Sequence, residues 1–348
     1  MARTRRSIAG RYLKRIEACR ATYELAAKQA AALIKEILVN SPALIHLINA
    51  RCKEKPSLWL KLCEKRYGQP TRQVTDIVAA RIITYYSDDV PIILKALNDA
   101  LEVDPHKSVN KREELAAVEF GYTSVHLIAR TKGGWSTSPQ YFALRNKWFE
   151  IQVRSILEHA WAEIEHEVVY KSGIDYPVLI KRRFARIAGA IEMLEHEFLT
   201  LRDHQQELIE LYKNRYDNGQ DGAAEIDSVR LIALLECERP ESLGWRRAAQ
   251  RGTPFPPHID NRCVKALKHT GIRTGRALRT VLNSKALKAA EALFAREHRI
   301  SEPLSHLNTA RLAVLLESPR TFADYFPEMV PDAAIRKLFA QRKSRGKR

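Results

Sequence analysis

Residues 149–171, FEIQVRSILEHAWAEIEHEVVYK, decide the fold expected for this chain. In FEIQVR every second residue is apolar, and the residues between them are an acid, an amide and a guanidinium. This is the period-2 pattern of a strand with one apolar and one polar face. Ser155 and Glu158 follow at the spacing of a capping box, so we expect the strand to run directly into a helix. Burying a polar row is costly unless its members have partners, so the polar face predicts a site.

The predicted helix also has a polar face, on which His159, Glu163 and His166 fall together. Two histidines and a glutamate on one face are a possible metal site, although such residues more often form hydrogen bonds. The apolar residues expected to anchor this helix are Leu157, Trp161, Ile164 and Val168.

The net charge of +17 in 348 residues is large, and it is concentrated toward the C-terminus. Up to Asp217 there are 34 Lys and Arg against 27 Asp and Glu, and beyond it 24 against 14. Such an excess suits a polyanionic partner, because Lys and Arg neutralise phosphates; a generally basic protein is the plainer alternative.

Cysteine and hydropathy patterns indicate a cytoplasmic protein. The five cysteines are widely spaced and include no CxxC, which favours free thiols over a disulfide framework or a structural zinc site. No apolar run approaches the roughly 18 residues of a membrane span. The basic N-terminus lacks the apolar segment of a secretion signal, so we expect no membrane association.

Before the 149–171 stretch, three segments contain candidate binding residues. Residues 7–50 are expected to be helical, with a break at Ser41 and Pro42, and a basic cluster including Arg51 and Lys53 then precedes a second helix. A helix N-terminus with adjacent cations suits a triphosphate, and the alternative is a solvated basic loop. Residues 74–86 and 120–130 are expected strands, and TKGGWSTSPQ (131–140) is an expected hairpin loop. The first strand begins near Asp76, a possible ligand of a hard metal.

The C-terminal part is expected to be helical. A long helix is predicted over 178–216, and NGQDGAA (218–224) is the best linker in the chain. Beyond it, the sequence of residues 308–326 weakly repeats that of residues 227–245. Residues 266–282, ALKHTGIRTGRALRTVL, have the spacing of a helix-hairpin-helix module. Its turn contains Gly271, and basic residues flank the turn: Lys265, Lys268, Arg273, Arg276 and Arg279. It is either a nucleic-acid-binding hairpin or a helical bundle with a solvated basic face.

Four ordered blocks together resemble the synthetase domain of the RelA/SpoT alarmone family, most closely its small alarmone synthetases. The matching positions are Arg51, Lys53, Ser57, Leu58 and Lys61; then Asp76, Ile77, Arg81 and Ile82, with Asp88 and Asp89 downstream; then Gly121, Tyr122, Ser124 and His126; and finally Glu150, Gln152, Arg154, Trp161, Ala162, Glu165, His166, Tyr170 and Lys171. The resemblance covers roughly residues 45–215.

The resemblance implies an α+β fold, a nucleotidyltransferase-like mixed sheet flanked by helices, followed here by an all-α domain. We therefore expect a pyrophosphokinase domain over 1–217 with its motif core at about 45–175, a linker at 218–224, and a basic helical domain with a basic tail over 225–348. The implied reaction transfers pyrophosphate from ATP to the ribose 3′-hydroxyl of GDP or GTP.

The resemblance also implies a role for each matched residue. Asp76 and Glu150 would bind Mg²⁺, and Glu150 would also be the base for the acceptor hydroxyl. The residues implied to bind ATP are Arg51, Lys53, Ser57, Lys61 and Arg81. Those implied to bind the acceptor are Tyr122, Ser124, His126, Gln152, Arg154, Glu165 and His166.

Two departures from the family pattern leave the acceptor open. The family's basic segment ahead of GYRS is replaced by EELAAVEF (113–120), and the arginine of GYRS is Thr123. Loss of these cations favours an alternative acceptor, the 3′ end of tRNA, which toxic members of the family modify. A third alternative is a catalytically inactive nucleotide- or nucleic-acid-binding protein. A homo-oligomer or a neutralising antitoxin is a further expected partner.

Overall fold

The computed structural model describes residues 2–65, 67, 69–111, 124–170, 177–240, 261–297, 304 and 306–326. The chain divides into two compact units, Met1–Leu199 and Thr200–Arg348, and the division falls within the long helix α9 (Val178–Asp217). The domain boundary that we predict at residues 218–224 remains a prediction.

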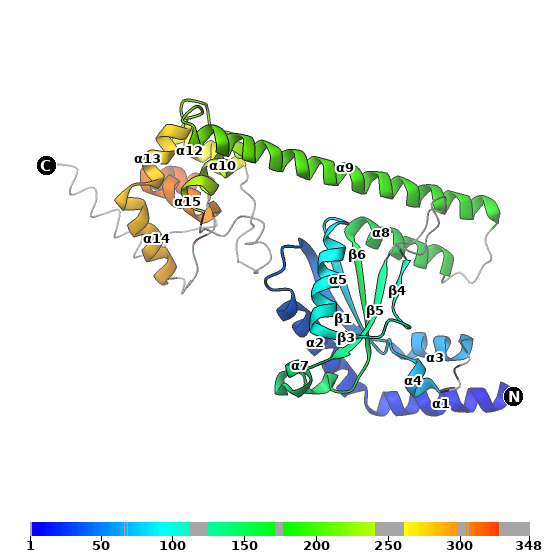
Figure 1. The fold of residues 1–348 in the computed structure, drawn as a ribbon. Helices are drawn as coiled ribbons and strands as arrows, with labels where there is room; N and C mark the ends of the chain where they lie inside the picture. Colours follow the sequence, from blue (N-terminus) through cyan, green and yellow to red (C-terminus); the bar gives the residue numbers. More distant parts are fainter. Residues whose placement is uncertain are drawn as a thin grey trace. The chain divides into compact units, whose positions relative to one another are not determined.

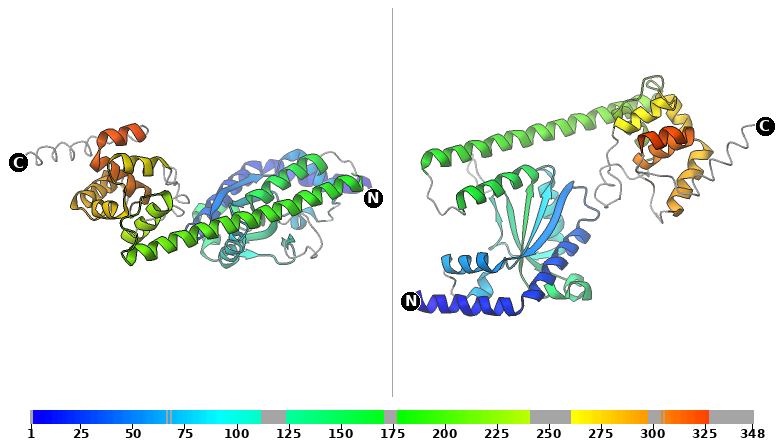
Figure 2. Two further views of the ribbon diagram at one scale, coloured as in Figure 1. Left: turned by 90° about the horizontal axis from the view of Figure 1, so that it is seen from above. Right: turned by 180° about the vertical axis from the view of Figure 1, so that it is seen from behind.

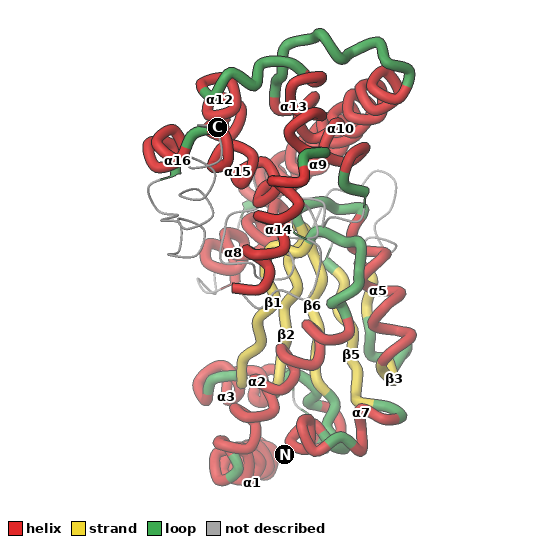
Figure 3. The backbone as a smooth tube through the Cα atoms, turned by 90° about the vertical axis from the view of Figure 1, so that its left-hand side faces the viewer, coloured by secondary structure: helices red, strands yellow, loops and turns green. Residues whose placement is uncertain are grey.

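The first unit is built on a six-stranded mixed sheet, in the order β1-β2-β6-β5-β3 with β4 also paired to β5 (Figures 1 and 3). The strands are β1 (Ile45–Cys52), β2 (Val78–Thr84), β3 (Leu101–Val103), β4 (Val109–Asn110), β5 (Val125–Thr131) and β6 (Phe149–Ser155). Only the β2–β6 pair is parallel among the pairs described. The predicted mixed sheet flanked by helices is confirmed.

One face of this sheet is apolar and is covered by helices α2 (Arg20–Ile37) and α5 (Asp89–Ala100). Alternate residues of the central strands, such as Ile82 and Ile151, are fully buried there with leucines and alanines of the two helices. Because side chains alternate along a strand, the polar residues between them lie on the opposite face. Burial of one face therefore determines where the polar row of β6 lies.

A second, smaller core joins helix α1 (Ala2–Ala18) to helix α3 (Lys55–Glu64). It includes Leu58 and Leu62 of α3 and Ile77, which directly precedes β2. The backbone N–H of Lys53 donates to the carbonyl of Ile77 (2.7 Å). These contacts bring the end of β1, the start of β2 and helix α3 together.

The strand-to-helix prediction at residues 149–165 is confirmed. β6 passes at Ser155 into helix α8 (Ile156–Glu165), and both hydrogen bonds of the capping box are present. Two of the four expected anchors of this helix are wrong, because Ile164 and Val168 are exposed while Trp161 is buried. The helix ends at Glu165 and a π-helical turn, η2 (His166–Tyr170), follows, so α-helical spacing does not continue to Val168.

Two further segments differ from expectation. Residues 45–50, predicted as helical, belong to strand β1, an edge strand whose residues are all exposed or only partly buried, with a register shift near Ile45. Such a strand has no clear apolar alternation to identify it. The segment after β5, predicted as a hairpin loop, contains the short helices α7 (Gly134–Thr137) and η1 (Pro139–Leu144). A four-residue helix, α4 (Pro70–Gln73), precedes β2.

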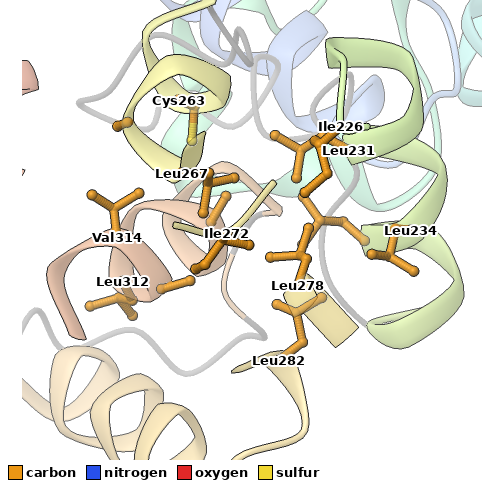
Figure 4. Packing of buried hydrophobic residues seen from close by; sticks show 14 of the residues in the cluster. Ile226, Leu231, Leu234, Cys263, Leu267, Ile272, Leu278, Leu282, Leu312 and Val314 are labelled. Carbon is orange, nitrogen blue, oxygen red and sulfur yellow. The ribbon is translucent and has the colours of Figure 1, made fainter. Parts of the chain in front are cut away.

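The second unit is helical in its described part, as predicted. Its helices after α9 are α10 (Ser228–Glu238), α12 (Asn261–His269), α13 (Gly275–Leu282), α14 (Lys285–Glu297), α15 (His306–Glu317) and α16 (Pro319–Tyr325). Figure 4 shows their apolar side chains meeting in one core, including Leu231 and Leu234 of α10 and Leu312 of α15. The weak sequence repeat therefore corresponds to two helices, α10 and α15, that place leucines at matching offsets in the same core.

The predicted helix pair around Gly271 is present as α12 and α13. Gly271 has φ +90°, a conformation that favours glycine. The segment before α10 pairs with the start of α13: Ile226 N–H donates to the Arg273 carbonyl (2.9 Å) and Arg276 N–H to the Gly222 carbonyl (2.8 Å). The predicted linker is thus hydrogen bonded to the helical unit.

No helix in the part of the chain that the structure describes is both long and apolar enough to cross a membrane.

Candidate active site

The polar face of the sheet brings the residues of four strands together. In the strand register, Arg51 of β1 lies opposite Ala79 of β2, which lies opposite Glu150 of β6. In the next row, Arg81 and His126 both lie opposite Gln152. These strand pairings place residues that are far apart in the sequence in two adjacent rows on one face of the sheet. The result is a surface of arginines, a histidine, an amide and a carboxylate.

Asp76 lies at one end of this surface, and two lysines contact it. Lys53 Nζ lies 2.7 Å and Lys61 Nζ 2.6 Å from Asp76 Oδ2. Asp76 is only 6% exposed, and its other oxygen, Oδ1, is buried without a hydrogen-bond partner in the described residues. Burial acts to raise the pKa of Asp76, but the two lysines outweigh it and hold this pKa below its ordinary value. Asp76 is therefore ionised, with one oxygen available to a further ligand.

Glu150 is the centre of a second set of contacts. His126 Nδ1 lies 2.7 Å from Glu150 Oε1, and the other ring nitrogen of His126 lies 2.8 Å from Ser124 Oγ. Gln152 Nε2 donates to Glu150 Oε2 (3.2 Å), and Arg154 Nη2 donates to Gln152 Oε1 (2.8 Å). Burial acts to raise the pKa of Glu150, but the hydrogen bond with His126 holds it below the usual range. The site thus contains a second ionised carboxylate whose orientation is fixed.

Asp76 and Glu150 lie in one electrostatic neighbourhood. The negative charge of Asp76 acts to raise the pKa of Glu150, and the positive charge of Lys61 acts to lower it. Among the described residues no group of three or more His, Cys, Asp or Glu could hold a metal. Two carboxylates with one orphaned oxygen still fit Mg²⁺, because this ion takes few protein ligands and completes its shell with water and phosphate oxygens.

Helix α8 adds a further ion pair at the edge of the surface. Arg81 Nη1 lies 2.9 Å from Glu163 Oε1, a contact that our sequence analysis did not find. His159 Nδ1 lies farther from the same oxygen, at 3.7 Å. The pKa of His159 is lowered, mainly by burial of the ring and next by the positive charge of the nearby Arg154. The alternative metal site on this helix is not supported, since Glu163 pairs with an arginine.

The remaining predicted residues lie around this centre or outside the description. Ser57 is exposed on α3, as is His166 at the start of the π-helical turn. Glu165, the last residue of α8, is half-buried, and burial raises its pKa. Tyr122, predicted to contact the acceptor, lies outside the described residues. The arrangement as a whole combines two ionised carboxylates with lysine and arginine cations and with hydroxyl, amide and imidazole groups.

A mixed sheet with carboxylates and cations on one open face defines a domain suited to polyphosphate ligands. The family described as "Region found in RelA / SpoT proteins" matches residues 50–175 of this chain. The chain therefore contains a RelA/SpoT region, and the resemblance predicted from the four sequence blocks is confirmed.

Two curated proteins of Bacillus subtilis (strain 168) are similar to it. GTP pyrophosphokinase YjbM is 27% identical over 169 residues, covering 47% of this chain and 74% of that protein. GTP pyrophosphokinase YwaC is 24% identical over 146 residues, covering 42% and 66%. A solved structure of the Bacillus subtilis small alarmone synthetase 1, bound to its product pppGpp, has 24% identity and a TM-score of 0.46. It covers 56% of this chain and 99% of that one.

Proposed function

We propose that this protein is an ATP-dependent pyrophosphokinase that transfers pyrophosphate to the 3′-hydroxyl of GDP or GTP. The observation that supports this most directly is the placement of ionised Asp76 beside Lys53 and Lys61, in the same electrostatic neighbourhood as Glu150. The similar proteins YjbM and YwaC are named GTP pyrophosphokinases. The proposal also accounts for the open polar face of the sheet.

In the proposed reaction the acceptor's 3′ oxygen attacks the β-phosphorus of ATP. A bond forms between this oxygen and phosphorus, the bond from the β-phosphorus to the oxygen bridging the α-phosphate breaks, and AMP leaves. The proton of the hydroxyl passes to Glu150. A base must be ionised and held in place, and the lowered pKa of Glu150 and its contact with His126 support its assignment as the base.

The donor end of the site is proposed to be formed by the cations around β1 and α3. Lys53 and Lys61 already contact Asp76, so their ammonium groups are held near the place where phosphates would bind. Arg51 is exposed on the same sheet face, and Ser57 lies on α3, two residues after its start. Arg81 is proposed to support the phosphates from the next row. Charge neutralisation and alignment are the main requirements of phosphoryl transfer.

Asp76 and Glu150 are the proposed Mg²⁺ ligands. Bound there, the ion would neutralise charge on the transferred group and align it with the acceptor. The acceptor end is proposed to include Ser124, His126, Gln152, Arg154, Glu165 and His166, together with Tyr122.

The test incubates the purified protein with Mg²⁺ and γ-labelled ATP, and with GDP, GTP or deacylated tRNA in parallel. We expect label on the guanosine nucleotide, and no label with Glu150→Gln. A matched control is Glu102→Gln, which removes a carboxylate paired with Arg130 on β3, away from the proposed site. Absence of label with every acceptor would instead support the inactive binding protein.

A second candidate acceptor, the 3′ end of tRNA, is favoured by the charge distribution of the second unit. Residues 261–290 contain eight Lys and Arg and no Asp or Glu, whereas residues 200–240 contain five Lys and Arg and nine Asp and Glu. Lys265, Arg273 and Arg276 are exposed at the α12–α13 hairpin. Exposed cations of this kind suit the phosphates of a nucleic acid.

This candidate predicts label on tRNA in the same assay. Changing Lys265, Arg273 and Arg276 to Gln should then reduce tRNA labelling and lower the salt dependence of tRNA binding. The control changes Lys14, Lys28 and Lys35 to Gln, which removes the same charge from exposed positions of α1 and α2. Equal losses in both triple variants would exclude a specific role for the hairpin.

A further inference from the structure

Strand β1 has an exposed amide, Asn49, to which the proposed reaction gives no role. Ile48 and Ala50 pack against the core on the apolar side of the sheet, so Asn49 and Arg51 lie on the opposite, polar face. β1 is an edge strand, shown in blue at one side of the sheet in the right-hand view of Figure 2. Asn49 lies opposite Arg81 in the strand register. The amide therefore belongs to the polar surface that forms the candidate active site.

The side chain of Asn49 is available to a ligand. Within the described residues, no hydrogen bond or ion pair joins the side chain of Asn49 or of Arg51 to another group. Arg81, by contrast, is held by Glu163 at 2.9 Å. Asparagine is depleted in strands, and here no hydrogen bond of its side chain stabilises the sheet. Its amide offers an acceptor oxygen beside N–H donors, which suits a ligand that presents a donor next to an acceptor.

The side chains along β1 follow the order of the groups in a nucleoside triphosphate. Lys53, directly after the strand, contacts Asp76 at the proposed phosphate end. Arg51 comes next, then Asn49, and then Leu47, which is exposed on the same face. At about 3.3 Å per residue, Asn49 lies roughly 13 Å along the strand from Lys53, a span that an extended triphosphate and ribose can cover. An amide beside an apolar side chain thus lies where the base would be.

We propose that Asn49 determines base specificity at the donor site, by hydrogen bonding both the 6-amino group of adenine and a ring nitrogen on the same edge of the base. This inference rests on the donor site proposed above. On either edge that contains the 6-amino group, adenine presents this donor next to an accepting ring nitrogen, so one amide can pair with both. Asparagine reads adenine in nucleic acids through the same pairing. The ligand class is a nucleoside triphosphate with a 6-aminopurine base.

The first test measures nucleotide binding by calorimetry, with Mg²⁺ and without an acceptor. The ligands are ATP and purine riboside triphosphate, which is ATP without the 6-amino group. We expect the wild type to bind ATP about 10-fold more tightly than the analogue, and Asn49→Leu to bind both with the weaker affinity. Leucine has the branching of asparagine without its polar atoms, and the position is exposed, so the Tm should not change.

The matched control is Asn98→Leu, which makes the same change at an exposed position of α5, over the apolar face of the sheet. It should keep the wild-type preference for ATP. A wild type that binds both nucleotides equally would overturn the role of Asn49 and leave the proposed function standing. An unchanged preference in Asn49→Leu would also overturn it, because another group would then read the base. A wild type that binds neither nucleotide would overturn the proposed function as well.

The second test separates the donor from the acceptor by the kinetics of pyrophosphate transfer. Asn49→Leu should raise the KM for ATP with little change in kcat, because a contact with the base is made equally in the ground state and the transition state. The KM for the acceptor should stay at its wild-type value. A rise in the acceptor KM with an unchanged KM for ATP would assign Asn49 to the acceptor end and would contradict the proposal.

Discussion

Lys61 Nζ lies 2.6 Å from Asp76 Oδ2, and this contact joins the last turn of helix α3 to a residue two positions before strand β2. Lys53 contacts the same oxygen from the end of the neighbouring strand. Three elements thus converge on one carboxylate oxygen and leave the other without a hydrogen-bond partner in the described residues. One oxygen of Asp76 holds the lysines and the other is left for a ligand, so the roles of Asp76 in stability and in activity can be tested separately.

Asp76→Asn should lower the proposed activity by ~10²-fold or more, because it removes a fixed charge from the reacting site. The free energy of unfolding should fall by less than the activation free energy rises. The lysines left without Asp76 are each about a quarter exposed, so water can hydrate them. Initial rates and urea unfolding measure the two quantities. The control is Asp99→Asn, which breaks an exposed pair with Lys95 and should change neither.

Asp76 should also contribute to acid sensitivity. Its pKa is lower in the folded chain than in the unfolded chain, so its stabilising contribution is present above the unfolded pKa of about 4 and is lost as the pH falls through the folded pKa. We expect the wild type to lose more free energy of unfolding than Asp76→Asn between pH 6 and the lowest pH at which both remain folded. Urea titrations at several pH values measure this, and equal losses would contradict it.

Gly275→Ala should destabilise the second unit. A Cβ at Gly275 would lie 2.6 Å from Cε1 of Tyr216, whose side chain is buried, so the ring or the start of α13 has to shift. Overpacking of this kind costs about 1–3 kcal/mol. Gly10→Ala is the matched control, because its Cβ would meet nothing within 4 Å in helix α1, and alanine favours a helix. In thermal unfolding experiments, only Gly275→Ala should show a lower Tm than the wild type.

Ser155→Ala should weaken the junction between β6 and α8. The Ser155 hydroxyl accepts from Glu158 N–H and donates to the Glu195 carboxylate, and alanine loses both contacts. Loss of an N-cap costs about 0.5–2 kcal/mol. Ser155→Thr retains the hydroxyl and should recover most of this free energy in urea unfolding. Failure of threonine to recover it would indicate that the site does not tolerate the extra methyl group.

The parts of the fold that sequence reasoning predicted correctly are those with a strong local signal. The β6–α8 junction has alternation and a capping box within ten residues, and α9 has a long helical pattern. Strand β1 was predicted wrongly because an edge strand with one paired side buries little, so its alternation is weak. The π-helical turn after Glu165 has no sequence signal that we used.

The candidate site could be predicted as a set of residues but not as a set of contacts. The motif blocks named Lys53, Lys61, Asp76 and Glu150, and the topology then determined which of them meet. The pairing of Arg81 with Glu163 was missed, because it depends on where α8 packs over the sheet.

The backbone pairing between residues 222–226 and the start of α13 has a consequence for limited proteolysis. A protease that cuts the chain between Asp217 and Gly222 would break one peptide bond without freeing the segment that follows. Residues 222–226 would stay attached to the α12–α13 hairpin through hydrogen bonds to Arg273, Gly275 and Arg276. The new N-terminus would lie near the basic α12–α13 hairpin, and the nicked fragment would keep its helical fold.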